Sequence, residues 1–98
     1  MLKVIAEDFI KREYLEVVAP IYAELVAATK KEPGCIEYNL FVDEDDERHF
    51  IFIEEWIDHQ ALDAHCASEH FTRLVPLINQ YQYKEGTALL MKSFPSES

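Results

Sequence analysis

The residues with the clearest chemical potential lie between His49 and Phe71, in the stretch HFIFIEEWIDHQALDAHCASEHF. His65 is the first candidate, because a neutral imidazole with an ordinary pKa of about 6.5 can remove a proton from a phenol or hydroquinone near neutral pH. The resulting anion donates electrons to dioxygen more readily than the neutral hydroxyl does. The alternative is a core histidine that is hydrogen-bonded to a strand carbonyl or to a carboxylate.

Trp56 and Glu54 are expected on one face of a strand, because they are two residues apart. Trp56 offers a flat surface on which an aromatic ring can stack, and its indole N–H can orient an oxygen atom. It can equally be a large core residue at a strand end. A carboxylate buried beside it must pair with a base or accept a hydrogen bond from a substrate hydroxyl, and structural pairing is the simpler of the two.

Further side chains are expected to complete a pocket around His65 and Trp56. His70 offers a second polar group, although its position just after Ser68 also suits a helix start. The remaining expected substrate-binding residues, besides Glu54 and His70, are Asp8, Tyr38, Asn39, Phe52, Leu62, Phe71 and Leu74.

Other kinds of site find little support. The four histidines do not form a compact metal-ligand pattern with nearby Cys or Glu residues, so no metal site is predicted. Cys66 directly follows His65, and neighbouring helical residues point about 100° apart, which argues against a Cys–His nucleophile pair. The two glycines cannot form a phosphate-binding loop or a dinucleotide fingerprint.

Length and charge restrict the class of protein. A chain of 98 residues, 49% of them apolar or aromatic, suits one compact domain, expected at residues 1–94 with a flexible tail at 95–98. The net charge of −10 opposes binding to nucleic acid or to anionic membranes. No apolar run approaches the ~20 residues of a membrane span, and the charged N-terminal residues do not resemble a secretory signal. We therefore expect a cytoplasmic protein with reduced cysteines.

Periodic apolar patterns predict the elements that must position these residues. Strands are expected at Leu2–Ile10, Cys35–Asp43, His49–Ile57 and Gly86–Phe94, and helices at Arg12–Lys31, His59–Ala67 and from Ser68 onward. Pro20 predicts a kink or a helix that starts just before it, and Pro76 predicts another bend. Asp58 and Ser68 are expected to cap the helices that follow them. The order βαββαβ is typical of a ferredoxin-like α+β sandwich, with helices on one side of an antiparallel sheet.

The expected strands carry large apolar side chains on both faces. In the third strand, for example, Phe50 and Phe52 alternate with Ile51 and Ile53. An antiparallel sheet needs only one apolar face, and an isolated subunit would expose more apolar surface than soluble proteins usually tolerate. We therefore expect a homodimer in which sheet packs on sheet. The alternative is that these are scattered apolar residues on the surface.

Five segments, in this order and at these separations, resemble a known family: MLKVIAE, KKEPGCIEYNLF, FIFIEEW, ALDAH and SEHF. They are similar to the antibiotic biosynthesis monooxygenase domain, whose members include small quinol monooxygenases, and the resemblance covers nearly the whole chain. It implies a dimeric α+β barrel and oxygenase chemistry without a metal or flavin cofactor. Glu69 departs from the family pattern, in which a proline is common before the His-Phe pair. In the haem-degrading branch the position of Asp8 resembles an asparagine, which counts against haem cleavage.

The residues and the resemblance together favour a cofactor-independent monooxygenase that uses dioxygen on a small hydroxylated aromatic compound or a quinol. His65 would act as the base and Trp56 as the stacking surface, while the apolar pocket excludes water. Three alternatives stay open. They are an isomerase of small hydroxyketones, a haem-handling or haem-degrading protein with His65 as axial ligand, and a small-molecule binding dimer without enzymatic activity.

Overall fold

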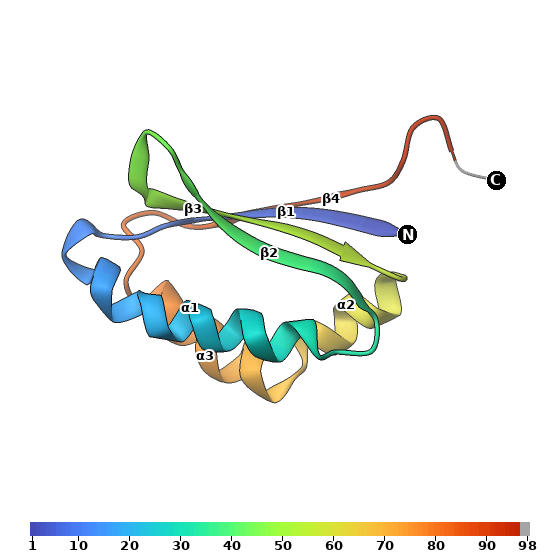
Figure 1. The fold of residues 1–98 in the computed structure, drawn as a ribbon, viewed down its shortest axis with the longest axis horizontal. Helices are drawn as coiled ribbons and strands as arrows, with labels where there is room; N and C mark the ends of the chain where they lie inside the picture. The colour runs from blue at the N-terminus through green and yellow to red at the C-terminus, as the bar shows by residue number, and fades with distance from the viewer. Residues whose placement is uncertain (97–98) are drawn as a thin grey trace.

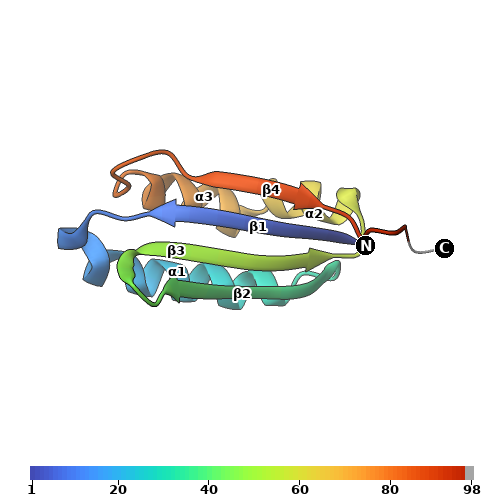
Figure 2. The same ribbon diagram turned by 90° about the horizontal axis from the view of Figure 1, so that it is seen from above.

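The computed structural model describes residues 1–96, in which a four-stranded antiparallel sheet carries helices on one face (Figure 1). The elements are β1 (Leu2–Phe9), a short 3-10 helix (Arg12–Tyr14), α1 (Leu15–Lys30), β2 (Cys35–Asp43), β3 (Asp46–Trp56), α2 (His59–Cys66), α3 (Glu69–Asn79) and β4 (Thr87–Met91). The strand order is β2-β3-β1-β4, as Figure 2 shows from above. This order confirms the predicted ferredoxin-like α+β fold. Residues 97 and 98 of the expected tail lie outside the described residues.

Three predicted boundaries differ from the structure by more than one residue. The first helix does not begin at Arg12, because a 3-10 turn precedes α1. The third strand begins at Asp46 and not at His49, because Asp43 pairs with Asp46 and the connecting turn is short. The fourth strand ends at Met91 and not at Phe94, because Met91 already pairs with Lys3, close to the beginning of β1.

A register shift near the beginning of β2 changes which side chains face the helices. Cys35 pairs with Trp56 and Glu37 with Glu55, so one extra residue lies between the two pairs. Strict alternation would place Ile36 on the same side as Tyr38. Instead Ile36 is 48% exposed, whereas Tyr38 is buried.

The predicted helix caps are confirmed. The carboxylate of Asp58 accepts a hydrogen bond from the Ala61 N–H at 2.8 Å, and the hydroxyl of Ser68 accepts one from the Phe71 N–H at 3.3 Å. Both prolines lie inside continuous helices, so the expected helix start just before Pro20 is not observed. These caps fix where α2 and α3 begin, and therefore which of their side chains face the sheet.

The main core lies between the sheet and the helices. Its buried members include Val18, Tyr22 and Leu25 of α1, Leu74 and Ile78 of α3, and Val4, Tyr38, Phe52 and Trp56 of the sheet. The other face of the sheet is also rich in apolar side chains, among them Ile5, Phe41, Ile53 and Leu89. Phe41 and Leu89 are 54% and 60% exposed. The face opposite the helices is therefore apolar and uncovered in the single chain.

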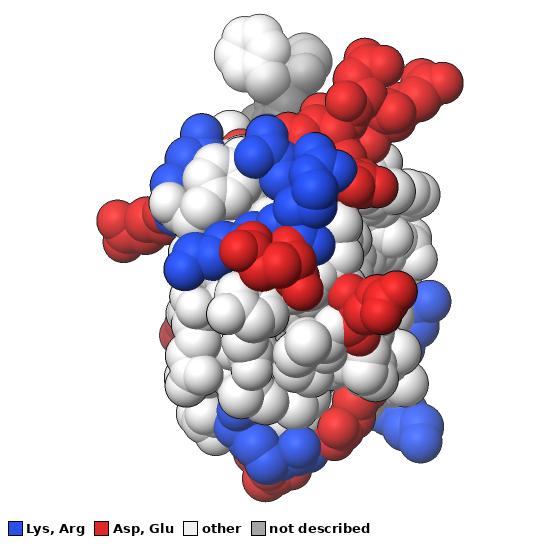
Figure 3. Space-filling view, turned by 90° about the vertical axis from the view of Figure 1, so that its left-hand side faces the viewer, with Lys and Arg blue, Asp and Glu red and all other residues white. Residues whose placement is uncertain are grey.

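Charged side chains gather at the end of the molecule where the β2–β3 turn lies. Figure 3 shows Lys and Arg side chains there among Asp and Glu side chains. Arg12 forms an ion pair with Glu47, and Arg48 forms one with Asp46. Acidic groups therefore offset the basic ones at this end. Within residues 1–96, no helix is long and apolar enough to cross a membrane.

Candidate active site

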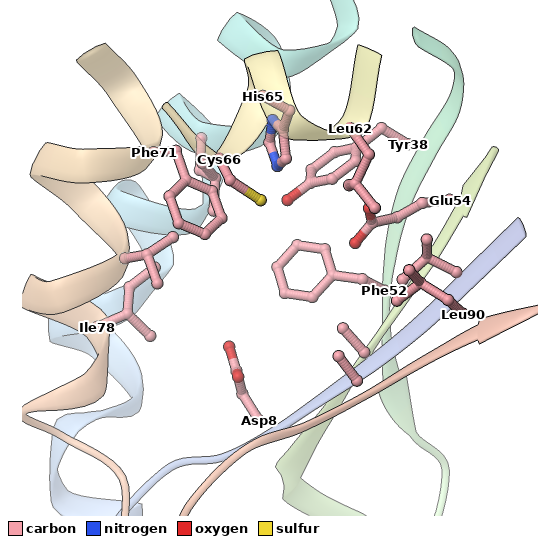
Figure 4. A pocket seen from close by; sticks show the side chains of 15 residues that line it. Asp8, Tyr38, Phe52, Glu54, Leu62, His65, Cys66, Phe71, Ile78 and Leu90 are labelled. Carbon is pink, nitrogen blue, oxygen red and sulfur yellow. The ribbon is translucent and has the colours of Figure 1, made fainter. Parts of the chain in front are cut away.

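A cavity of about 230 Å³ lies between the sheet and the helices α2 and α3 (Figure 4). Its walls are mostly apolar, and all four strands contribute to them. Ala6 and Ala88 face each other across β1 and β4, and both line the cavity. Leu90, which is 47% exposed, lies at the β4 side. The cavity therefore has an apolar interior that reaches the surface near β4.

His65 lines this cavity from α2 and is 2% exposed. Its Nδ1 lies 2.7 Å from Oε2 of Glu32, just before the β2 strand. Because a carboxylate only accepts hydrogen bonds, Nδ1 must carry the proton and donate it to Glu32. The other ring nitrogen, Nε2, is then an unprotonated acceptor on the side of the cavity (Figure 4). This arrangement gives the imidazole the tautomer that a general base requires.

The surroundings of His65 also keep the ring neutral. Burial lowers its pKa, while the hydrogen bond and negative charge of Glu32 act in the opposite direction. The net pKa lies below the ordinary value of 6.5. At neutral pH the imidazole is therefore unprotonated at Nε2 and able to accept a proton.

Glu32 also binds a second histidine. Nε2 of His70 lies 2.7 Å from the same Oε2 atom that binds His65. Within residues 1–96, Glu32, His65 and His70 form a group that could hold a metal ion, with ligand atoms all within 4.8 Å of one another. No local sequence pattern predicts this group, because Glu32 lies 33 residues before His65. In the structure, one ring nitrogen of each histidine is hydrogen-bonded to the Glu32 carboxylate.

Trp56 does not lie on the cavity wall, so its expected role as a stacking surface for the substrate needs correction. The ring is fully buried and packs against the His65 ring, with centroids 4.7 Å apart and planes 35° apart. Its Nε1–H donates a hydrogen bond to Oε1 of Glu54 at 3.0 Å. Trp56 therefore supports two cavity residues from behind.

Glu54 places a carboxyl group inside the cavity and is 5% exposed. Burial raises its pKa to about 6, although the hydrogen bond from Trp56 lowers it. The side chain can therefore exchange a proton close to neutral pH. Tyr38, on the neighbouring strand, lies opposite Glu54 in the sheet and also lines the cavity. Burial and the nearby negative charge of Glu54 raise the pKa of the tyrosine, which keeps its hydroxyl protonated.

Asp8 lies at the other end of the cavity, where Figure 4 shows its carboxylate directed into the space. The hydroxyl of Tyr22 donates a hydrogen bond to Oδ2 at 2.6 Å, and the amide of Gln82 donates one to Oδ1 at 3.4 Å. Burial raises the pKa of Asp8, and these two donors oppose that shift. The cavity thus has polar groups at both ends and apolar walls between them.

The structure brings seven of the eleven expected site residues to the cavity. They are Asp8, Tyr38, Phe52, Glu54, Leu62, His65 and Phe71.

The other four lie elsewhere. Trp56 and His70 contact cavity residues or their partners from outside. Asn39 follows Tyr38, which faces the cavity, so Asn39 points to the opposite face of the sheet. Leu74 is 2% exposed and belongs to the core, because α3 turns Phe71, Val75 and Ile78 toward the cavity.

Several important residues were missed from the sequence. Glu32 lies in the KKEPGCIEYNLF segment, and no local pattern links it to His65. Tyr22 and Gln82, which hold Asp8, come from α1 and from the segment after α3. Cys66 lines the cavity next to His65. The resemblance of the KKEPGCIEYNLF segment to the family was the one signal that could have drawn attention to Glu32.

Residues 1–77 match the family described as antibiotic biosynthesis monooxygenase. The chain belongs to this family. A crystal structure of an antibiotic biosynthesis monooxygenase is 61% identical, with coverage of 97% of this chain and 100% of that one and a TM-score of 0.95. A conserved protein from Methanosarcina mazei is 29% identical, with coverage of 92% and 89% and a TM-score of 0.89.

An uncharacterised protein from Synechocystis is 36% identical over 50 residues, which are 51% of this chain and 34% of that protein. This chain thus aligns with about a third of that relative. The antibiotic biosynthesis monooxygenase match covers β1 to most of α3, including Glu32, Glu54 and His65. Ala88 and Leu90 of β4 lie beyond the matched residues, although they line the same cavity.

Proposed function

We propose that this protein is a cofactor-independent monooxygenase that acts on a small hydroxylated aromatic compound or quinol. The observation that carries the proposal is the position of His65. Its Nδ1 is held by Glu32, and its ring lines an apolar cavity of about 230 Å³. A base in such a cavity can deprotonate a phenolic hydroxyl, and the apolar walls exclude water from the anion that forms. Membership of a family described as monooxygenases supports the same chemistry.

The proposed reaction begins when Nε2 of His65 takes the proton of a phenolic hydroxyl. The phenolate passes one electron to dioxygen, and the resulting superoxide and substrate radical combine to form a carbon–oxygen bond. Loss of water then leaves a quinone. For a phenol the balance is one phenol plus one dioxygen giving one para-quinone plus one water. The substrate supplies all four electrons, so no external reductant is required.

Oxygen uptake with a panel of hydroquinones and naphthols tests this proposal. We expect wild-type protein to exceed the rate of autoxidation without enzyme, and with labelled dioxygen to place one labelled atom in the product. The variant His65→Ala should lose roughly a hundredfold or more in kcat, the usual size of a general-base contribution. Protein treated with a chelator should keep its activity, because no step uses a metal ion.

His59→Ala is the matched control, because His59 is an exposed histidine at the beginning of the same helix. It should turn over at the wild-type rate. Equal rates in wild-type and His65→Ala protein would contradict the role of the base. Formation of hydrogen peroxide without labelled product would contradict monooxygenation.

A second candidate is an isomerase of small hydroxyketones. The observation that favours it is that a neutral imidazole, His65, and a carboxyl group with a pKa of about 6, Glu54, line the same cavity. Proton transfer between adjacent carbons needs such a pair and no dioxygen. Assays under anaerobic conditions separate the two functions, because only the isomerase would continue. The cavity is smaller than the roughly 300–1,000 Å³ of common ligand pockets, which disfavours haem as a ligand.

A further inference from the structure

We infer that Asp8 selects ligands that carry a hydrogen-bond donor, such as a second hydroxyl, at the end remote from His65, and disfavours a carbonyl or ether oxygen there. This inference rests on the proposed function and assigns Asp8 the recognition of the oxygen atom at the far end of the substrate. It also predicts that the enzyme binds the reduced form of the substrate more tightly than the oxidised form.

The first observation is the arrangement of polar groups along the cavity. In the sheet, Glu54 pairs with Val4, and Asp8 lies four residues farther along the same strand. Four residues of strand span about 13 Å. Figure 4 shows Asp8 and His65 on opposite sides of the cavity, with the Phe52 ring between them. A ligand bound at His65 therefore extends toward Asp8 when it is long enough.

The second observation is the state of the Asp8 carboxylate. Its Oδ2 atom lies 2.6 Å from the Tyr22 hydroxyl, which is the short distance expected for an O–H donor to a charged carboxylate. Gln82 donates to the other oxygen. Each oxygen of a carboxylate can accept two hydrogen bonds, so each retains acceptor capacity toward the cavity. Within residues 1–96 no lysine, arginine or histidine forms an ion pair with Asp8.

These observations make Asp8 a hydrogen-bond acceptor at the end of an apolar cavity. A ligand hydroxyl at this position donates a hydrogen bond to the carboxylate. This bond replaces the one that the hydroxyl made to water, so the free-energy cost of removing the hydroxyl from water is small. A carbonyl or ether oxygen in the same place has no proton to donate, so two acceptors would face each other. A quinol that becomes a quinone therefore loses its contact with Asp8. The same group would favour binding of the substrate and release of the product.

Binding under anaerobic conditions tests the inference without depending on turnover. Two matched pairs serve as probes: hydroquinone with 4-methoxyphenol, and naphthalene-2,6-diol with 6-methoxy-2-naphthol. Members of a pair differ in whether the distal oxygen can donate. We expect wild-type protein to prefer the diol roughly tenfold to a hundredfold in Kd in the pair that spans the cavity. In Asp8→Asn this preference should fall to about threefold or less, because an amide both donates and accepts.

Asp8→Asn has nearly the same size as the wild-type residue, so a preference that survives in this variant would show steric exclusion of the methyl group and overturn the inference. Asp63→Asn, an exposed position in α2, is the matched control and should keep the wild-type preference. No preference in the wild-type protein, or no binding of any probe, would also overturn it. The wild-type comparison stands even if Asp8→Asn does not fold.

Two further measurements separate this inference from others. His65→Ala should keep the preference for diols while it loses oxygen uptake. Diol preference in a wild-type protein that takes up no oxygen, or oxygen uptake that is equal in wild-type and His65→Ala protein, would count against the proposed function and leave the inference standing. Turnover together with equal Kd values for diols and ethers would overturn the inference and leave the proposed function standing. A ligand with an ammonium group, 6-(aminomethyl)-2-naphthol, tests whether the carboxylate prefers a cation. Tighter binding of this amine than of the diol would overturn the assignment to a hydroxyl.

Discussion

His65 has two neighbours that act on it in different ways. Glu32 fixes the proton on Nδ1 and so leaves Nε2 free to accept one. Trp56 covers one side of the ring and at the same time holds Glu54 through its indole N–H. Neither neighbour lines the cavity, so both act as positioning residues for groups that do.

The variant Glu32→Gln should therefore change the pH dependence of oxygen uptake as well as its rate. The charge and hydrogen bond of Glu32 raise the pKa of His65, so their loss lowers it. The acidic limb of the kcat/KM profile should move to lower pH. The plateau should fall by roughly tenfold or more, because the base is weaker and its tautomer is no longer fixed. A uniform fall without movement of the limb would indicate a merely structural role for Glu32.

Glu54 makes the native state sensitive to pH in the opposite sense to a paired carboxylate. Its folded pKa of about 6 lies above the ordinary value of 4.5. Well below pH 4.5 Glu54 is protonated in both the folded and the unfolded state, so its ionisation does not change the free energy of unfolding. As pH rises through this interval the unfolded chain releases its proton first, so the native state loses up to about 2 kcal/mol.

Glu54→Gln removes this loss. Relative to wild-type, its free energy of unfolding should gain about 2 kcal/mol between about pH 4 and about pH 8. Denaturant titrations at the two pH values measure the change. Glu44→Gln, in the exposed β2–β3 turn, is the control and should show little change. Parallel stability curves for Glu54→Gln and wild-type would mean that the carboxyl group is not desolvated.

At the residue scale, the sequence predicted side chains whose direction follows from local periodicity. Phe52, Glu54 and His65 reached the cavity because strand and helix periods place them there. Contacts between distant segments could not be predicted in this way. The partner of His65 lies 33 residues away, and Gln82 lies 74 residues from Asp8.

At the scale of elements, Gly34 allows α2 to pack closely against the beginning of β2. A Cβ atom at Gly34 would lie 2.3 Å from the Cβ of Ala61. The Gly34 carbonyl also accepts a hydrogen bond from the Ile57 N–H at 3.0 Å, which fixes the approach. Because α2 carries His65, this contact helps to set how far the imidazole extends into the cavity.

Gly34→Ala should therefore destabilise the protein by about 1–3 kcal/mol through overpacking. The double variant Gly34→Ala with Ala61→Gly should recover part of this loss, because Ala61→Gly removes the atom that clashes. Ala61→Gly alone should cost about 1 kcal/mol from helix propensity. Ala64→Gly, at an exposed position of α2, is the control and should not rescue Gly34→Ala. Thermal unfolding of the four variants measures the coupling, and simple additivity would contradict it.

The elements themselves were largely predictable, and their ends were less so. Asp58 and Ser68 begin helices through contacts within three residues, which a sequence pattern contains. The beginning of β3 and the end of β4 depend on pairing with neighbouring strands, which a local sequence pattern does not contain. The register shift between Cys35 and Glu37 likewise depends on pairing with β3, so the alternation of β2 alone could not reveal it.

At the scale of the whole molecule, the uncovered apolar face of the sheet leads us to expect a homodimer. Leu89 and Phe41 lie on this face and are more than half exposed. Leu89→Asp would place a charge in the interface and should weaken association by roughly 2 kcal/mol or more, about thirtyfold in Kd. Sedimentation equilibrium measures this change.

Val17→Asp is the control for the dimer, because Val17 is 42% exposed on α1, among the helices on the other side of the sheet. It should leave association unchanged. A wild-type protein that stays monomeric at high micromolar concentration would contradict the expected assembly.

Ala6 and Ala88 give the fold a simple means of changing its ligand. These two methyl groups oppose each other on adjacent strands and line one wall of the cavity. Branched side chains at the two positions would fill space that a second aromatic ring needs, while His65 and Asp8 would keep their places. One backbone can thus accommodate substrates of different length with the same reactive groups, and the change requires only two neighbouring positions on β1 and β4.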